Sequence, residues 1–217
     1  MKIFAINGSP RKNWNTSSLI KKVLEGAVTQ DVETKIINLY ELKYQGCISC
    51  FACKRKGGEY GKCAMKDDLS PVLEALKTAD AIVFGSPIYF MNITSGMTAF
   101  LERFLFSNMI YSFATPTVFP WEIPSIFLYT MNVTEEQMCE FGVEDNLRAY
   151  QNFIGKTLGK PPKLFYAYNT YQFSDYDKYE SSMFSEEEKA KYKAVQFPLD
   201  CQKAFNMGID LADSFRS

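Results

Sequence analysis

The sequence predicts an α/β fold, a three-layer sandwich in which helices cover both faces of a five-stranded parallel sheet. Apolar runs of strand length alternate with helical apolar patterns along the chain. A polar loop, Gly8–Ser18, directly follows the first run, where such a sheet places a phosphate-binding loop. We therefore expect the strand order 2-1-3-4-5, with residues 1–217 forming a single domain.

Five apolar runs are expected to form the strands. Uninterrupted apolar residues are typical of strands that are buried on both faces, as they are in a parallel sheet. The runs are Ile3–Ile6, Ile36–Leu39, Ala81–Phe84, Ser125–Tyr129 and Leu164–Tyr168. Parallel strands have their carboxyl ends at one edge of the sheet, so the functional site is expected at that edge.

Helical patterns separate most of these runs. The first helix is expected to begin within Gly8–Ser18, because apolar residues then recur at helical spacing as far as Ala27. Further helices are expected near Leu69–Ala79 and Ser95–Phe106. The inner face of a final helix carries Cys201, Ala204, Phe205, Gly208, Leu211, Ala212 and Phe215.

The loop Gly8–Ser18 has the features of a phosphate cradle. A phosphate there would meet the N–H groups and positive dipole of a helix start, three hydroxyls and the guanidinium of Arg11. The motifs of a P-loop and of a dinucleotide-binding turn are both missing, so a mononucleotide is the remaining ligand. The alternative is an ordinary polar turn in which Asn15 or Thr16 is the N-cap.

Composition excludes several classes of function. The net charge of -1 and the lack of a basic stripe argue against nucleic-acid binding. No apolar stretch has the length of a membrane span or a signal peptide, so a cytoplasmic protein without membrane contact is expected. The chain has no histidine, which excludes catalysis by imidazole. Hydride transfer by a bound cofactor is compatible with all of these constraints.

Two loops carry a resemblance to a known family. The segment Gly8-Ser9-Pro10-Arg11 is similar to the phosphate loop of the NAD(P)H-dependent FMN reductases, although Trp14 stands where that loop has a small residue. A second Gly-Ser-Pro turn at Gly85 is similar to their second FMN loop, and the match continues to Arg103. The resemblance implies a flavodoxin-like fold, non-covalently bound FMN, NAD(P)H as electron donor, a small acceptor such as a flavin or quinone, and a homodimer or tetramer.

The resemblance also implies the cofactor-binding residues. The first loop would hold the phosphate and the second would border the isoalloxazine ring, while the chemistry stays on flavin N5 without an obligatory catalytic side chain. The residues implied are Ser9, Arg11, Asn15, Thr16, Ser17, Ser18, Pro87, Ile88, Tyr89, Phe90, Met91 and Asn92. A third flavin loop is expected near Thr130–Asn132, where no specific motif marks it.

A group of cysteines suggests a metal centre. Cys47, Cys50 and Cys53 are spaced by three residues, and Cys63 follows. Zinc sites usually take two separated pairs of cysteines, whereas a fused triple with a distant fourth cysteine suits a [4Fe-4S] cluster. The loop resembles the compact cysteine motif of iron-sulfur flavoproteins, although Cys63 lies further along the chain than their fourth cysteine. The alternative is a loop of reduced thiols that binds no cluster.

Two further segments are rich in aromatic residues. They are 107–124, with Tyr111, Phe113, Phe119 and Trp121, and 171–184, with Tyr171, Phe173, Tyr176, Tyr179 and Phe184. Long ordered loops of this kind often cover binding sites or pair subunits, and we expect that role here. The alternative is that they pack on their own chain.

The sequence therefore favours an FMN-dependent NAD(P)H oxidoreductase. The first alternative is an iron-sulfur flavoprotein or a flavodoxin-type carrier that passes electrons to a protein partner without nicotinamide turnover. The second alternative is a flavodoxin-like domain that binds no flavin and regulates a partner, and Trp14 supports it.

Overall fold

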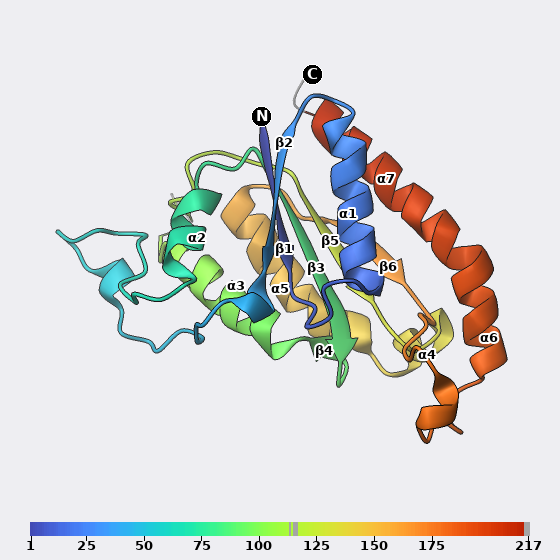
Figure 1. Cartoon of the computed structure of the whole chain (residues 1–217). Coiled ribbons are helices and arrows are strands. Elements are labelled where there is room, and N and C mark those ends of the chain that lie inside the picture. The colour runs from blue at the N-terminus through green and yellow to red at the C-terminus, as the bar shows by residue number, and fades with distance from the viewer. Residues whose placement is uncertain (113, 115–116, 215–217) are drawn as a thin grey trace.

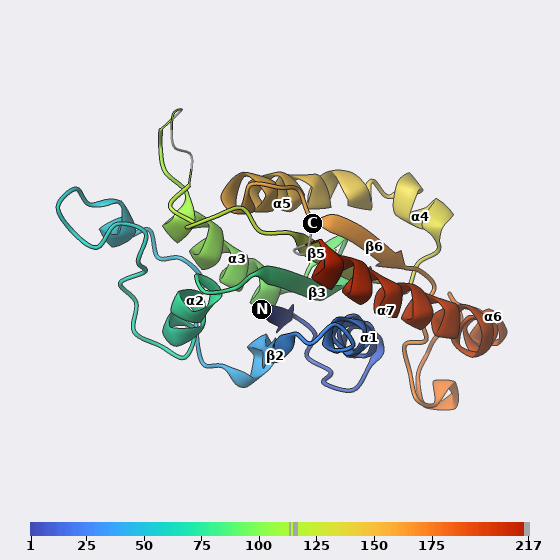
Figure 2. The same ribbon diagram turned by 90° about the horizontal axis from the view of Figure 1, so that it is seen from above.

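The computed structural model describes residues 1–112, 114 and 117–214. Phe113 and Phe215, both named above, lie outside the described residues. The chain forms a central sheet between two layers of helices, as Figures 1 and 2 show from two directions. The predicted fold class is confirmed.

The sheet has the predicted arrangement of long strands. The strands are β1 (Lys2–Asn7), β2 (Glu33–Asn38), β3 (Ala81–Tyr89), β5 (Ser125–Thr130) and β6 (Lys163–Ala167), in the order β2-β1-β3-β5-β6 with parallel pairing throughout. The short strand β4 (Asn92–Ile93) folds back antiparallel on the end of β3, and the sequence analysis did not predict it. Without β4 in the count, the order is the expected 2-1-3-4-5.

Helices cover both faces of the sheet. Helices α1 (Asn15–Val28) and α7 (Phe197–Asp213) lie on one face, and α2 (Ser70–Leu76), α3 (Ser95–Asn108) and α5 (Val143–Leu158) lie on the other. The short helices α4 (Glu135–Glu140) and α6 (Glu186–Lys191) lie beyond the carboxyl ends of the strands. No helix in the described part of the chain is long and apolar enough to cross a membrane.

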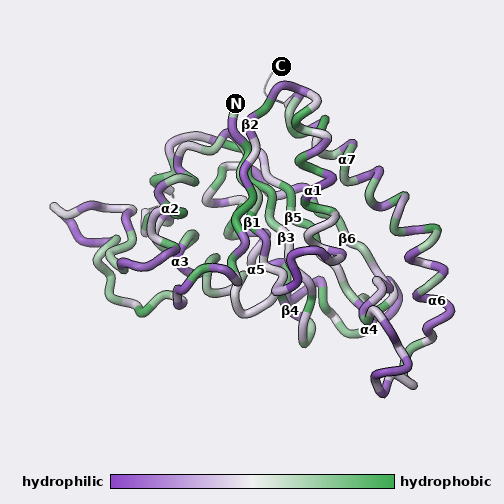
Figure 3. Tube along the Cα trace, in the orientation of Figure 1, coloured by the Kyte–Doolittle hydropathy of each residue, from purple (hydrophilic) through white to green (hydrophobic). Residues whose placement is uncertain are grey.

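Two apolar clusters form the core, one on each side of the sheet. The strands in Figure 3 are largely hydrophobic because alternate residues feed the two clusters. Helices α1 and α7 touch through glycines: a Cβ on Gly26 would stand 2.0 Å from the carbonyl oxygen of Phe205, and one on Gly208 would stand 1.9 Å from that of Val23. The expected inner face of the last helix is confirmed at Ala204, Leu211 and Ala212, which are buried.

The two aromatic segments have different roles. In 107–124, the buried Phe119 packs edge-to-face on Phe104, and the indole nitrogen of Trp121 donates to the carbonyl of Ala79. Phe119 thus joins the core of its own chain, whereas Tyr111 and Trp121 are exposed, so a role of this segment in pairing subunits stays a prediction. The segment 171–184 begins at the other edge of the sheet, beside the cavity described next.

Candidate functional site

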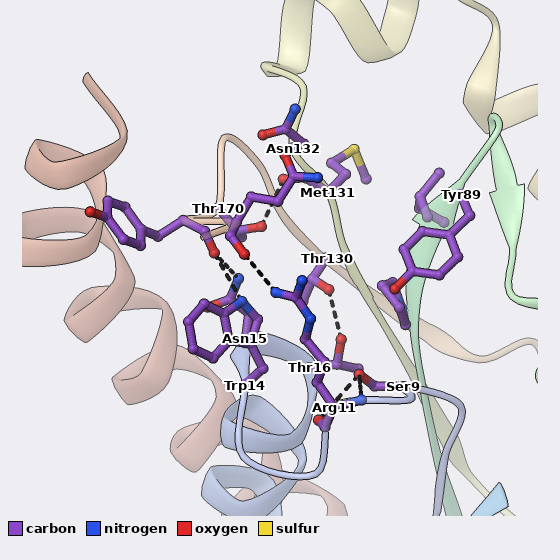
Figure 4. Close-up of a pocket in the computed structure, with 14 residues that line it drawn as sticks. Ser9, Arg11, Trp14, Asn15, Thr16, Tyr89, Thr130, Met131, Asn132 and Thr170 are labelled. Carbon is purple, nitrogen blue, oxygen red and sulfur yellow. Dashed lines mark hydrogen bonds between the residues drawn. The ribbon is translucent and has the colours of Figure 1, made fainter. Parts of the chain in front are cut away.

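A cavity opens at the carboxyl edge of the sheet, where loops from four strands meet (Figure 4). It lies between β1 and α1 on one side and the end of β3 on the other. Its lining residues are Ser9, Arg11, Trp14, Asn15, Thr16, Pro87, Ile88, Tyr89, Thr130, Met131, Asn132, Thr170, Tyr171 and Gln172.

The first loop is held in place by the end of β1. The side chain of the buried Asn7 accepts from the backbone N–H of Ser9 at 3.0 Å and donates to the Ser17 hydroxyl at 3.0 Å. The N–H of Gly8 donates to the carbonyl of Gly85 at 2.8 Å, which joins the first loop to the second. A Cβ on Gly8 would approach Cβ of Met97 to 2.9 Å, so this close contact requires glycine.

The start of α1 is open toward the cavity. Trp14 occupies the N-cap position and makes no side-chain cap, so the N-cap that the alternative interpretation placed at Asn15 or Thr16 is wrong. Within the described residues, the N-cap side chain therefore leaves the first N–H groups of the helix uncapped, at the positive end of its dipole. The hydroxyl of Thr16 is hydrogen-bonded to that of Thr130 at 2.7 Å, which fixes the helix start to the end of β5.

Three side chains of the first loop reach across to the segment that follows β6. Arg11 donates through Nη1 to the carbonyl of Gln172 at 2.5 Å, and its guanidinium lies 5.2 Å from the Trp14 ring. Trp14 Nε1 and Asn15 Nδ2 both donate to the carbonyl of Tyr171, at 3.0 and 2.9 Å (Figure 4). Residues 171 and 172 thus form one wall of the cavity, as expected for part of the second aromatic segment.

The second loop contributes one face of the cavity. Pro87, Ile88 and Tyr89 line it, and partial burial raises the pKa of the Tyr89 phenol. Phe90 and Met91 form the tip of the β3–β4 hairpin at φ angles of 48° and 61°, with Phe90 fully exposed. The left-handed backbone at two residues other than glycine makes this turn a strained one.

The third loop is stabilised by a buried lysine. Lys189 of α6 donates to the carbonyl of Asn132 at 2.8 Å and to Oδ1 of Asn169 at 2.9 Å. Burial lowers the pKa of Lys189 to about 8. Asn132 Oδ1 and Gln172 Oε1 are buried without a hydrogen-bond partner in the described part of the chain. Buried polar atoms are normally paired, so these two acceptors, on residues that line the cavity, lack the partner expected of them.

The structure brings most of the predicted cofactor-binding residues to this cavity. Those that line it are Ser9, Arg11, Asn15, Thr16, Pro87, Ile88 and Tyr89. Ser17, Ser18, Phe90, Met91 and Asn92 are not among the lining residues. Ser17 supports the first loop without lining the cavity, because its hydroxyl donates to the carbonyl of Arg11 at 2.8 Å.

Sequence reasoning did not single out Thr170 and Gln172, which complete the wall after β6. They belong to no motif, and Gln172 contributes through a backbone carbonyl as well as its side chain. Their position after the last strand could have predicted them, because the carboxyl end of that strand lies at the same edge of the sheet as those of the other strands. The third loop, Thr130–Asn132, lines the cavity where that rule placed it.

A second, separate cavity lies at the cysteine loop. Cys47, Cys50, Cys53 and Cys63 all line it, with Arg103 of α3 among the other lining residues. Cys53 is buried, Cys50 is exposed, and burial raises the pKa of the Cys53 thiol. The loop is tied to α3 by the N–H of Cys47, which donates to the Glu102 carboxylate at 3.1 Å.

Two cations flank this cysteine cavity. The ammonium of Lys54 donates to the carbonyls of Phe106 and Met109 at the end of α3. The side chain of Arg103 is fully buried, and its Nη1 is paired with Asp67 and with the carbonyl of Gln45. Within the described residues, no three Cys, Asp or Glu side chains are arranged to hold a metal ion together, so the cluster stays a prediction.

Comparison with known proteins connects these observations to a family. A family model described as NADPH-dependent FMN reductase matches residues 1–117. An iron-sulfur flavoprotein of Methanocaldococcus jannaschii is 36% identical over 103 residues, which are 48% of this chain and 51% of that protein. One of Archaeoglobus fulgidus is 38% identical over 109 residues, 50% of this chain and 51% of that protein. The chain spans about half the length of the curated relatives it matches.

A solved structure extends the likeness to the whole fold. An NAD(P)H:quinone oxidoreductase from Methanothermobacter marburgensis superposes with a TM-score of 0.71 over 97% of this chain and 96% of that one. The sequence identity is 13%, so the likeness concerns the fold alone.

Proposed function

This chain belongs to the NADPH-dependent FMN reductase family, and from that premise we propose that it is an FMN-dependent NAD(P)H oxidoreductase. It would pass electrons from the reduced nicotinamide to a small acceptor, such as a flavin or a quinone. One observation carries the proposal: Arg11, the uncapped start of α1 and the loop Pro87–Tyr89 line the same cavity.

The phosphate end of the cavity suits an anion. The guanidinium of Arg11 supplies a charge, the open N–H groups of α1 supply donors, and the helix dipole favours negative charge at the same point. Arg11 already donates to a neutral carbonyl of the opposite wall. Replacing that acceptor with a phosphate oxygen would give a stronger, charge-assisted hydrogen bond.

The other end suits a flat ring with a polar edge. Pro87, Ile88 and Tyr89 present an apolar and aromatic surface, and the opposite side carries the unpaired acceptors of Asn132 and Gln172. A ring N–H or a sugar hydroxyl of the bound cofactor would satisfy these acceptors. The cavity thus offers donors at one end and acceptors at the other, which matches the two ends of FMN.

The chain's own residues position the cofactor rather than perform the chemistry. Bound FMN supplies hydride acceptance from NAD(P)H and electron delivery to the acceptor. The phenol O–H of Tyr89, which lines the cavity, can donate a hydrogen bond to the cofactor. The Thr16–Thr130 hydrogen bond and the Gly8–Gly85 contact hold the walls at fixed separation.

The iron-sulfur flavoprotein is the second candidate, and one observation favours it. Four thiols line a single cavity outside the FMN site, which a plain reductase does not need. In that case the thiol-bound cluster would exchange single electrons with the flavin and a partner. We also retain the prediction of a homo-oligomer from the family resemblance.

The first experiment is the visible spectrum of protein purified without oxygen, followed by titration with FMN. Flavin bands, or uptake of added FMN, are expected, and a colourless protein that binds no FMN would refute the proposal. Oxidation of NADH and NADPH is then measured with a quinone or ferricyanide as acceptor. Turnover supports a reductase, whereas FMN binding without turnover supports an electron carrier.

A further inference from the structure

The cysteine cavity contains a buried cation that the protein itself leaves partly unpaired. Arg103 is 1% exposed, and Nη1 makes its hydrogen bonds to Asp67 and Gln45. Its Nε and Nη2 have no hydrogen-bond partner in the described part of the chain. Burying charged donors without acceptors is costly, so these two groups need an explanation.

The two unpaired donors lie on one edge of the guanidinium. Nε–H and an Nη2–H point in parallel, and this edge binds anions through two hydrogen bonds at once. Asp67 pairs with the guanidinium through Nη1, so it does not use the edge formed by Nε and Nη2. Arg103 lines the same cavity as the four thiols, and the thiol of Cys63 lies close enough to contact its guanidinium. That contact does not meet hydrogen-bond geometry at Nε or Nη2 in the described part of the chain, so the edge still lacks a good acceptor.

The second cation, Lys54, does not compete for this role. Its ammonium is bound by carbonyls at the end of α3 and lies 4.7 Å from the centre of the Phe106 ring. Lys54 therefore fastens the cysteine loop to the helix, whereas Arg103 is among the residues that line the cavity together with the four thiols.

A thiolate centre has the charge that this edge would bind. Four thiolates around a divalent metal, or around a [4Fe-4S] core, carry a net negative charge, and sulfur in such centres accepts N–H hydrogen bonds. Neutral thiols are weak acceptors and would leave Nε and Nη2 of the guanidinium nearly unpaired. The donor set and the orphaned guanidinium edge both fit a sulfur-ligated centre better than a loop of free thiols.

We propose that Arg103 is a positioning residue for a [4Fe-4S] centre held by Cys47, Cys50, Cys53 and Cys63, to whose sulfur atoms its Nε and Nη2 donate. The hydrogen bonds orient the Cys63 side of the centre and stabilise its more negative, reduced form. This inference does not depend on FMN binding. It concerns how the chain retains the centre and sets its reduction potential.

The test compares wild-type protein with Arg103→Lys after anaerobic reconstitution with ferrous iron and sulfide. Lysine keeps the charge but loses the two-donor edge. We expect the variant's centre to have a more negative reduction potential in a dithionite titration followed by electron paramagnetic resonance. We also expect it to lose iron to a chelator faster. Equal potential and equal iron retention in the two proteins would overturn the proposal, as would a wild type that binds no iron and sulfide.

Two control variants separate this role from a structural one. Asp67→Asn weakens the ion pair but leaves both donors of Arg103, so its reduction potential should stay near that of the wild type. Cys139→Ser removes an exposed thiol outside the cavity and should retain the full iron content. If Asp67→Asn shifts the potential as far as Arg103→Lys does, the effect comes from folding and the proposal fails.

A measurement on the wild type covers the case in which Arg103→Lys does not fold. With arginines labelled by 15N, binding of Cd2+ to the cysteines should shift the Nε–H resonance of Arg103 more than that of any other arginine. An unmoved resonance would contradict the proposal. FMN affinity, measured in the same samples, shows separately whether the reductase proposal holds.

Discussion

The two cavities of this protein differ in how they are built. The cavity at the carboxyl edge of the sheet is enclosed by strand ends and a helix start, and hydrogen bonds join its walls before any ligand binds. The cysteine cavity lies between α3 and a loop outside the sheet, in which Ser49 and Phe51 adopt φ angles of 54° and 56°. Arg103 of α3 has two donors without a hydrogen-bond partner in the described part of the chain. The first cavity is preorganised, whereas in the second the buried guanidinium is paired, within the described residues, through Nη1 alone.

This difference indicates how a ligand of each cavity would affect affinity and stability. A ligand of the first cavity meets groups that are already in place, so each lost group should reduce affinity more than stability. A ligand of the second cavity should add structure, because it would satisfy Arg103 and fix a loop with left-handed residues. The predictions below test this contrast.

The largest effect is expected for Arg11→Ala on FMN affinity. Loss of a charge-assisted hydrogen bond costs about 1.5–3 kcal/mol, which corresponds to a Kd raised by about 10- to 100-fold. Stability without FMN should change little, because the Arg11 side chain is exposed. Fluorescence titration with FMN measures the affinity. Lys12→Ala is the matched control, since this neighbouring cation pairs with Glu41 and does not line the cavity.

A smaller effect, on stability, is expected for Thr16→Val. It leaves the buried hydroxyl of Thr130 without its 2.7 Å partner, at a cost of about 1–3 kcal/mol in the free energy of unfolding. Urea denaturation measures this cost. The double variant Thr16→Val/Thr130→Val should recover part of the loss, because both polar groups are then removed. A double variant that shows the full sum of the two single losses would mean that the two hydroxyls are not coupled.

The lowered pKa of Lys189, which supports the third loop of the first cavity, predicts that the stability of the protein depends on pH. Burial lowers its pKa to about 8 from the usual 10.5, so between these values the unfolded chain binds a proton that the folded chain does not. Stability should therefore rise with pH above about 8, relative to the variant Lys189→Met, in which this contribution is absent. The difference between the two proteins is followed by urea denaturation from pH 7 to pH 9.5. If the difference in stability between the wild type and Lys189→Met stays constant with pH, Lys189 does not cause the pH dependence.

The smallest effect is expected for Ser49→Gly in the cysteine loop. Glycine adopts the left-handed conformation without strain, so relieving it should stabilise the protein without metal by up to about 1 kcal/mol. Ser181→Gly, at a partly buried serine, is the control, because Ser181 is not among the described residues with positive φ. Thermal unfolding measures both variants. If Ser49→Gly destabilises the protein without metal as much as Ser181→Gly does, the loop is not strained and the contrast between the cavities weakens.

Much of the fold could be predicted from local patterns. The five apolar runs became the five long strands, and the one-edge rule placed Gly8–Ser18, Pro87–Tyr89 and Thr130–Asn132 around one cavity. The hairpin at Phe90 and Met91 escaped prediction because its left-handed residues are not glycines. The missing side-chain N-cap of α1 also escaped it, because Asn15 and Thr16 turn to partners on distant strands and loops.

The sequence by itself determined the layers, the strand order and the family, because apolar periodicity and glycine-containing loops depend on neighbouring residues along the chain. Only the tertiary structure decided which groups meet: Arg11 with the carbonyl of Gln172, Thr16 with Thr130, and Arg103 with the cysteine cavity. Such contacts join residues far apart in sequence, and pairing depends on burial, direction and distance in space. No pattern along one chain records those quantities.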